Sequence, residues 1–263
     1  MASEPRVKFS VFTKPWKLGI PELAEFVAAF GFDGIELPVR PGYQVEPVDV
    51  ARGLPRIARQ LSEFGLRIFS VAAPTDEATI VACAEAGVPI IRTMVRVGPD
   101  GYLSTEAQIR SEYDALLPLL ERYGVKLGVQ NHCDRFVANA TGLRSLVERY
   151  PPELVGVVWD AAHEALNGMD PEMALEVVWS HLCMVNLKNA IWQRVGGPEA
   201  EVAQWRHYWT SGRHGLASWP RVAAELRKRE YTGVVCLTAE YSDEAAVNRL
   251  VAEDISFARS LFA

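Results

Sequence analysis

Polar and ionisable side chains end four apolar runs in the second half of the chain. These runs finish as Val129-Gln130-Asn131-His132, Val158-Trp159-Asp160 with His163 one turn later, Val185-Asn186-Leu187-Lys188-Asn189, and Leu237-Thr238-Ala239-Glu240. Core packing does not call for such residues, because an unpaired buried charge is costly. Carboxylate and imidazole groups that meet at one site can move protons, so Asp160, His163 and Glu240 together indicate a functional site. For each residue alone, pairing at a strand end is the alternative.

A recurring junction supplies the elements that would bring these side chains together. A helical stretch, a glycine and a short β-rich run follow one another at Phe30-Gly31-Phe32, Phe64-Gly65-Leu66, Ala86-Gly87-Val88 and Tyr123-Gly124-Val125. Glycine is favoured just after a helix because it adopts the left-handed conformation at little cost. The whole pattern predicts eight strands, near residues 6–12, 34–39, 66–72, 89–95, 126–131, 155–160, 182–188 and 233–240.

Strands that alternate with helices pair in parallel through right-handed crossovers. Eight such units favour an α/β fold with one (β/α)8 TIM barrel, a single domain over residues 1–263, and this length suits that fold. An open doubly wound sheet would carry a glycine-rich phosphate turn after its first strand, where the sequence is Thr13-Lys14-Pro15-Trp16. The carboxyl ends of barrel strands share one face, so the polar residues above are expected to converge there.

A long connection at about residues 189–216, between the seventh strand and the seventh helix, is predicted as an irregular loop. Its aromatic residues argue against disorder: Trp192, Trp205, Tyr208 and Trp209. We expect a lid or a subunit contact, and burial of these rings in an oligomer is the alternative.

Composition excludes several classes of function. The net charge of −6 and the pI near 5.5 give no basic surface for a nucleic acid. No apolar run reaches the roughly 18 residues that span a bilayer, so we expect no membrane contact and a cytoplasmic protein. The four cysteines are widely separated and suggest neither disulfides nor a thiolate zinc site. Only Cys133, at a strand end, keeps a functional interpretation.

The order of these motifs resembles the xylose isomerase-like TIM barrel superfamily, which includes ketose 3-epimerases, hydroxypyruvate isomerases and inosose dehydratases. The likeness covers nearly the whole chain. Its most specific pieces are Trp159-Asp160-Ala161-Ala162-His163 and Gly215-Leu216-Ala217-Ser218-Trp219, with a Leu-Lys pair on strand seven and a glutamate after strand eight. The resemblance implies a small sugar-like substrate and a homo-oligomer, either a dimer or a tetramer.

The resemblance also implies a divalent cation, Mn or Mg, held by Glu, Asp, His and Glu on strands five to eight. The matching positions here are Gln130, Asp160, Asn186 and Glu240, so two ligands are replaced by amides. An all-oxygen set with two negative charges suits magnesium, manganese or calcium rather than zinc. Loss of one charge predicts a weakened metal site, and an absent metal is the other expectation.

Family epimerases resemble two-base enzymes in which the glutamates of strands five and eight face opposite sides of the reacting carbon. Gln130 cannot accept a proton, so we expect Glu240 to be the principal base. His163 or His132 is then expected to supply the second proton transfer or to bind a substrate hydroxyl. A satisfied histidine under the rim is the alternative for His132.

Other candidates would line the mouth. By resemblance, Lys188 and Arg213 contact substrate oxygens, with ordinary ion pairs as the alternative. Trp16 and Tyr43 follow strands one and two, where an aromatic ring can stack on a sugar or pack under a loop. Three further charged residues are expected to pair across the mouth or to bind substrate: Glu36, Arg92 and Arg96.

Three functions fit these residues. The first is an isomerase or epimerase acting on a sugar, sugar acid or polyol-derived ketone through an enediolate. The second is a dehydratase on the same scaffold, for which one base and one acid suffice. The third is a non-catalytic sugar-binding member that has lost metal ligands. Apurinic endonucleases share the barrel and the Asp-x-x-His element, but the chain lacks their histidines after strands three and four.

Overall fold

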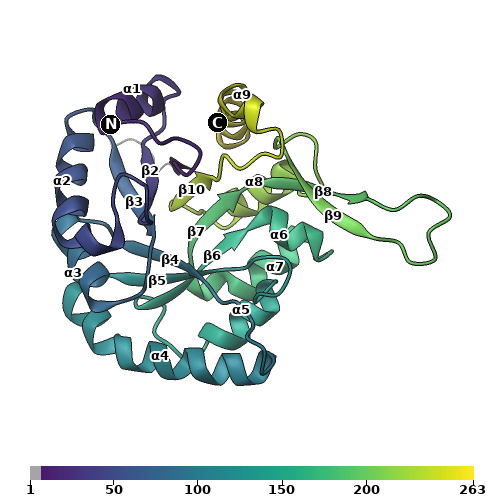
Figure 1. Cartoon of the computed structure of the whole chain (residues 1–263), viewed down its shortest axis with the longest axis horizontal. Coiled ribbons are helices and arrows are strands. Elements are labelled where there is room, and N and C mark those ends of the chain that lie inside the picture. The colour runs from purple at the N-terminus through teal and green to yellow at the C-terminus, as the bar shows by residue number, and fades with distance from the viewer. Residues whose placement is uncertain (1–6) are drawn as a thin grey trace.

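Eight parallel strands close into a barrel in the computed structural model, which describes residues 7–263 (Figure 1). The strands run β1 (Lys8–Phe12), β2 (Gly34–Pro38), β3 (Arg67–Ala72), β4 (Ile90–Met94), β5 (Lys126–Gln130), β6 (Val155–Asp160), β7 (Leu182–Leu187) and β10 (Val234–Leu237). This confirms the predicted (β/α)8 TIM barrel and its strands, whose ends differ by at most three residues. The predicted first strand begins at residue 6, which lies outside the described residues, as do residues 1–5 of the predicted domain.

Helices between the strands cover the outside of the barrel (Figure 1). They are α1 (Ile20–Ala29), α2 (Val50–Ser62), α3 (Glu77–Ala86), α4 (Tyr102–Tyr123), α5 (Ala140–Val147), α6 (Ala161–Leu166), α7 (Pro171–Val178), α8 (Trp219–Lys228) and α9 (Val247–Phe262), with 3-10 turns at Pro47–Asp49, Trp179–His181 and Glu244–Ala246. Gly87 and Gly124 end α3 and α4 with φ of 68° and 63°, the left-handed conformation that the junction pattern predicts. Within the described residues, no helix is long and apolar enough to span a bilayer.

The barrel interior changes from apolar to polar toward the strand ends that carry the candidate residues. One cluster of buried apolar side chains includes Phe12, Ile90, Val158 and Met184. Near it lie polar side chains that are also buried, namely Ser10, Glu36, Ser70, Arg92 and Asn186. Such groups are stable inside a protein only with hydrogen-bond partners, so the polar end is where a ligand can be bound.

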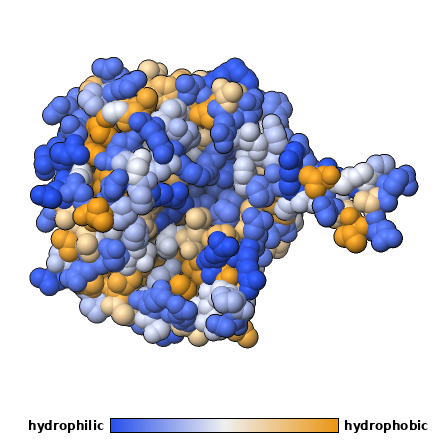
Figure 2. All heavy atoms as spheres, in the orientation of Figure 1, coloured by the Kyte–Doolittle hydropathy of each residue, from blue (hydrophilic) through white to orange (hydrophobic). Residues whose placement is uncertain are grey.

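The connection expected to be irregular is instead a β-hairpin, so that prediction was wrong. Strands β8 (Asn189–Arg194) and β9 (Trp205–Thr210) pair antiparallel along their whole length, which satisfies the backbone groups that face one another. This arm, residues 189–210, projects from the barrel (Figure 1). Figure 2 shows hydrophobic atoms on it, and its exposed apolar residues are Trp192, Val195, Val202 and Trp205. The lid, the subunit contact and the homo-oligomer stay predictions.

Candidate active site

Glu240, just after β10, forms ion pairs with two lysines. Its Oε2 lies 2.8 Å from Nζ of Lys188, which follows β7, and its Oε1 pairs with Lys14, which follows β1. Burial raises the pKa of Glu240, but the charges and hydrogen bonds of Lys188 and Lys14 outweigh it and hold the pKa well below its ordinary value. The carboxylate is therefore ionised at neutral pH, and both of its oxygens are engaged.

Asp160 is completely buried at the end of β6 and caps helix α6. Its Oδ1 accepts hydrogen bonds from the backbone N–H groups of Ala162 and His163, at 3.0 and 3.1 Å. Burial raises the pKa of Asp160 to about 6, opposed by the charge of Lys188 and by the bond from His163. The negative charge of Glu240 also acts on Asp160. Asp160 ends β6 and Glu240 follows β10, and both strands pair with β7, so the two carboxylates lie at the same end of the barrel.

A buried ion pair joins β2 to β4. Nε of Arg92 donates to Oε1 of Glu36 at 2.6 Å, and Ser70 donates to the same oxygen at 3.0 Å. Nη1 of Arg92 donates to Oε1 of Gln130, also at 2.6 Å. The expected pair between Glu36 and Arg92 is therefore present. Arg96 lies apart, exposed, with its guanidinium 5.9 Å from the ring of Phe136.

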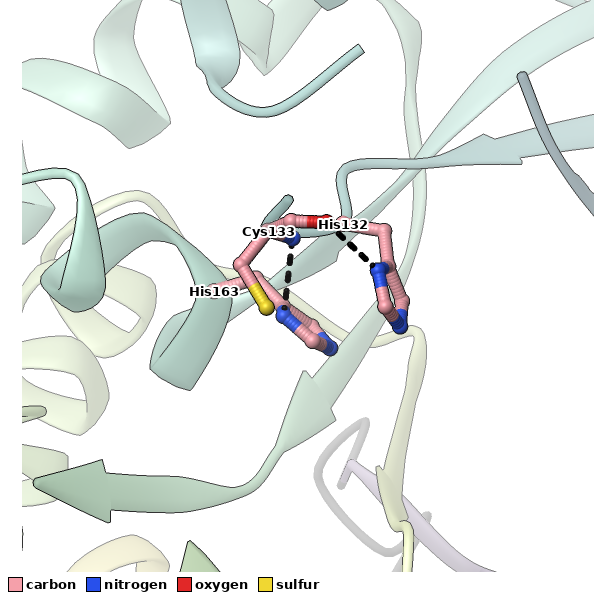
Figure 3. Close-up of side chains that lie close together, drawn as sticks. All are labelled: His132, Cys133 and His163. Carbon is pink, nitrogen blue, oxygen red and sulfur yellow. Dashed lines mark hydrogen bonds between the residues drawn. The ribbon is translucent and has the colours of Figure 1, made fainter. Parts of the chain in front are cut away.

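Two histidine rings lie side by side at the mouth, with centroids 4.1 Å apart (Figure 3). The backbone N–H of Cys133 donates to Nδ1 of His163 at 3.1 Å, which places the proton of that ring on Nε2. Nδ1 of His132 lies 2.9 Å from the carbonyl oxygen of Cys133, so Nδ1 carries the proton there and Nε2 is free to accept. Burial lowers the pKa of both rings, and the charge of Lys188 adds to the effect. The pair thus presents one N–H donor and one acceptor.

His132, Cys133 and His163 are also close enough to share a metal ion, but their chemistry does not suit one. Nδ1 of His163 already accepts a hydrogen bond, and its Nε2 carries a proton. Burial raises the pKa of the Cys133 thiol to about 12, so ligation would carry the cost of deprotonating it. A second group, Cys133 with Asp134 and His207, depends on the same thiol.

The four positions that match the family's metal ligands do not fit a divalent ion either. The oxygen of Gln130 accepts from Arg92, and its amide nitrogen donates to Oδ2 of Asp160 at 3.1 Å. Both oxygens of Glu240 pair with lysines. The side-chain nitrogen and oxygen of Asn186 are buried and have no hydrogen-bond partner among residues 7–263. At three of the four positions, Gln130, Asp160 and Glu240, the atoms that an ion would need are therefore already engaged.

A cavity of about 520 Å³ opens beside Glu240. Trp16, buried and held by a 2.8 Å hydrogen bond from Nε1 to Oδ1 of Asn248, forms part of its wall. Polar and aromatic side chains predominate among its other lining residues, which include Lys14, Tyr43, Trp209, Tyr241 and Glu244. Arg213 is not among them: it is exposed and its guanidinium lies 3.8 Å from the ring centre of Phe257 on α9.

Asn189 and Trp219 fix the backbone of Lys188. Nε1 of Trp219 donates to the carbonyl oxygen of Lys188 at 3.0 Å. Nδ2 of Asn189 donates to the carbonyl oxygens of Gly212 and Ala217, and its Oδ1 accepts from the N–H of Ala217. A Cβ on Gly215 would come within 2.0 Å of that Oδ1. The Gly-x-x-x-Trp motif therefore belongs to the support of Lys188.

Sequence reasoning missed two charged residues. Lys14 follows β1. From the sequence, this segment was used only to exclude a phosphate loop, and the candidate named there was the aromatic residue Trp16. Glu164 follows His163, and its Oε2 accepts from Trp159, from the backbone of Ala140 and from Asn131 at 3.0, 2.9 and 3.3 Å. Burial raises the pKa of Glu164 to about 7. A glutamate next to a motif histidine was the available signal for this second residue.

The chain belongs to the xylose isomerase-like TIM barrel family, whose model matches residues 24–261. Similar solved structures include the probable 3-DHS dehydratase AsbF of Bacillus anthracis, with TM-score 0.72 and 14% identity over 95% of this chain and 98% of that one. A D-psicose 3-epimerase from Clostridium cellulolyticum has TM-score 0.73 and 13% identity over 97% and 99%. The 3-keto-D-glucoside 4-epimerase YcjR of E. coli has TM-score 0.70 and 14% identity over 97% and 100%.

At these identities the likeness shows the fold alone. The named proteins are epimerases and a dehydratase, all on this barrel. No curated protein sequence matches the chain.

Proposed function

We propose that this chain is an isomerase or epimerase of a small sugar, sugar acid or polyol-derived ketone, acting by proton transfer through an enediolate. The observation that carries the proposal is an ionised carboxylate paired with a buried ammonium, which the ring of Trp209 connects to a neutral histidine pair. Glu240, Lys188, His132 and His163 supply these groups. Together they offer a proton acceptor, a cation and hydrogen-bond donors for one substrate.

In the proposed reaction, Glu240 takes the proton from the carbon that bears a hydroxyl next to the substrate carbonyl. The electron pair of the broken C–H bond moves onto the carbonyl oxygen, where the ammonium of Lys188 stabilises the negative charge. Return of a proton to the neighbouring carbon, with transfer of the hydroxyl proton to the former carbonyl oxygen, isomerises the substrate. Return of a proton to the opposite face of the original carbon epimerises it. Lys14 is the more exposed partner of Glu240, and a substrate oxygen that draws it away would raise the basicity of the carboxylate.

The histidines take complementary roles in this proposal. His163 is held as an Nε2–H donor, which suits a bond to a substrate oxygen. His132 presents an unprotonated Nε2, so it is the group that accepts the proton of a substrate hydroxyl and, once protonated, returns a proton to carbon. The expected Mn or Mg cofactor enters no step, because Gln130, Asp160 and Glu240 at its positions are engaged with one another and with cations.

A dehydratase is the second candidate, and Gln130 favours it. Its oxygen is fixed by Arg92, so the mouth has no second base where the family's strand-five glutamate would lie. Removal of a hydroxyl β to a carbonyl needs one base and one acid, which Glu240 and a histidine could provide.

The test is proton NMR in heavy water on a panel of ketoses, aldoses, sugar acids and inososes. Deuterium incorporation with the carbon skeleton retained is the expected result, and it must disappear in Glu240→Gln. An unsaturated or deoxy product would identify the dehydratase. If no compound reacts with the folded wild-type protein, the catalytic proposal fails and a sugar-binding role replaces it.

A further inference from the structure

We infer that three side-chain cations, Lys188, Lys14 and Arg92, take the place of the divalent ion at this mouth, so that the protein neither binds nor needs one. As far as it concerns catalysis, the inference rests on the proposed function. The part that concerns metal binding stands on the geometry alone. Beyond the loss of two ligands, these three side chains supply the positive charge that the ion would have provided.

The three cations engage two of the four positions where ligands would be required. Lys188 and Lys14 bind the two oxygens of Glu240, and Arg92 binds the oxygen of Gln130. Lys188 and Arg92 are almost completely buried, with side chains 5% exposed. A divalent ion would have to displace these groups and would then lie close to fixed charges of its own sign. The oxygens of Glu240 and Gln130 are therefore held by cations and are not available to a divalent ion.

Gln130 supports the same conclusion through the direction of its amide. If Gln130 were a ligand, its oxygen would point toward Asp160 and share an ion with it. Instead the nitrogen of Gln130 donates to Oδ2 of Asp160 at 3.1 Å. Because a guanidinium can only donate hydrogen bonds, Arg92 bonds to the oxygen of Gln130 and leaves the amide nitrogen facing Asp160.

Lys188 is placed to do what a Lewis acid does for a carbonyl. Its Nζ is anchored between the carboxylate of Glu240 at 2.8 Å and the ring centre of Trp209 at 3.6 Å. An ammonium group can both neutralise a developing oxyanion and donate a hydrogen bond to it. Asn186 lies in the same polar end of the barrel with both side-chain polar atoms buried and unpartnered among residues 7–263. We assign these amide atoms to a hydroxyl and its neighbouring oxygen on the substrate, rather than to an ion.

The first test is a Mn²⁺ titration of the metal-free full-length protein, followed by electron paramagnetic resonance. The signal of free Mn²⁺ is expected to rise in proportion to the added metal, as in buffer alone. The matched variant is Gln130→Glu/Asn186→His/Lys188→Met, which restores the family's ligand types and removes the central ammonium. It is expected to bind one Mn²⁺ per chain, and circular dichroism checks that it is folded.

Two results would overturn the inference. One is a stoichiometric Mn²⁺ site in the wild-type protein that is lost in Glu240→Gln. The other is a folded triple variant that still binds no Mn²⁺, because Lys188 would then not be the cation that excludes the ion. Neither readout uses turnover, so both remain decisive if the heavy-water experiment finds no reaction. If the heavy-water experiment finds a reaction, its rate is expected to be unchanged by exhaustive dialysis against a chelator and to fall at least tenfold in Lys188→Met.

Discussion

The ammonium of Lys188 lies 2.8 Å from Oε2 of Glu240, at the carboxyl ends of two neighbouring strands, β7 and β10. The two residues come from segments 52 positions apart in the sequence. Their pairing fixes the charge of both groups, and the burial of the Lys188 side chain, which is 5% exposed, strengthens the interaction. The properties of Glu240 therefore depend on Lys188.

Replacing Lys188 with methionine tests this dependence directly. The substitution keeps the length of the side chain and removes its charge, so the pKa of Glu240 is expected to rise. Its ionisation can be followed by carbon-13 NMR of the glutamate carboxyls, with Glu240→Gln used for assignment. Lys228→Met, at an exposed lysine on α8, is the control and should leave the titration unchanged. An unaltered pKa in Lys188→Met would contradict the proposed coupling.

The two histidines are expected to remain neutral in opposite tautomers. Long-range proton–nitrogen NMR should show His163 protonated on Nε2 and His132 protonated on Nδ1 at pH 7, because Cys133 donates to one ring and accepts from the other. Since the pKa of His163 is well below its ordinary value, its pattern should persist to acidic pH. The variants His132→Asn and His163→Asn assign the signals. An Nδ1–H tautomer at His163 would disprove the assigned donor role.

The sequence predicts the barrel well because its strands are marked twice, by apolar runs and by the stops of the helices between them. Gly87 and Gly124 show this, since each ends a helix and sets the start of the next strand. The convergence of Asp160 and Glu240 follows from the same rule, because parallel strands present their carboxyl ends on one face.

Contacts made by long side chains could not be predicted in the same way. Lys14 reaches Glu240 across 226 residues of sequence, and nothing in the run Thr13-Lys14-Pro15-Trp16 specifies the partner. The arm was also missed. Its strand Trp205–Thr210 lies after a glycine- and proline-containing segment and has no buried residue, so apolar burial does not reveal it. Pairing between its own two strands determines its structure.

Removing one partner of the buried ion pair between Arg92 and Glu36 is expected to lower the free energy of unfolding. Arg92→Met leaves the carboxylate of Glu36 buried without its counter-charge and frees the oxygen of Gln130. Loss of one partner of such a pair lowers the free energy of unfolding by about 3 to 5 kcal/mol. Urea denaturation measures this change. In Arg92→Met/Glu36→Leu the loss should be smaller, and Arg96→Met, at an exposed arginine, should be neutral. Equal losses in the single and double variants would refute the interpretation.

Glu164 is expected to make stability depend on pH between about 4.5 and 7. Its pKa is about 7 in the folded protein, against an ordinary value of 4.5. In this window the unfolded chain binds fewer protons at this site, so the free energy of unfolding falls as pH rises. The contribution of this one group is on the order of 3 kcal/mol at most.

Glu164→Gln removes this titration and retains an oxygen for the bonds from Trp159, Ala140 and Asn131. The difference in stability between variant and wild type should therefore shift in favour of the variant as pH rises from 4.5 to 7. Taking the difference cancels the contribution of Asp160 and Asp254, whose pKa values are also raised, to about 6. Glu148→Gln, at an exposed glutamate, serves as the control. A difference that is constant with pH would show that Glu164 does not titrate in this range.

Gly215→Ala is expected to disturb the support of Lys188 without touching the mouth itself. The added Cβ would approach Oδ1 of Asn189 to 2.0 Å and the backbone nitrogen of Ala190 to 2.7 Å, and backbone atoms cannot give way cheaply. Overpacking of this kind lowers the free energy of unfolding by about 1 to 3 kcal/mol. Gly19→Ala is the matched control, because a Cβ there meets no atom within 4 Å. Urea denaturation measures the loss, and the pKa of Glu240 reports the position of Lys188: the pKa should rise in Gly215→Ala alone. If Gly215→Ala and Gly19→Ala have the same free energy of unfolding and the same pKa of Glu240, the hydrogen bonds around Asn189 do not position Lys188.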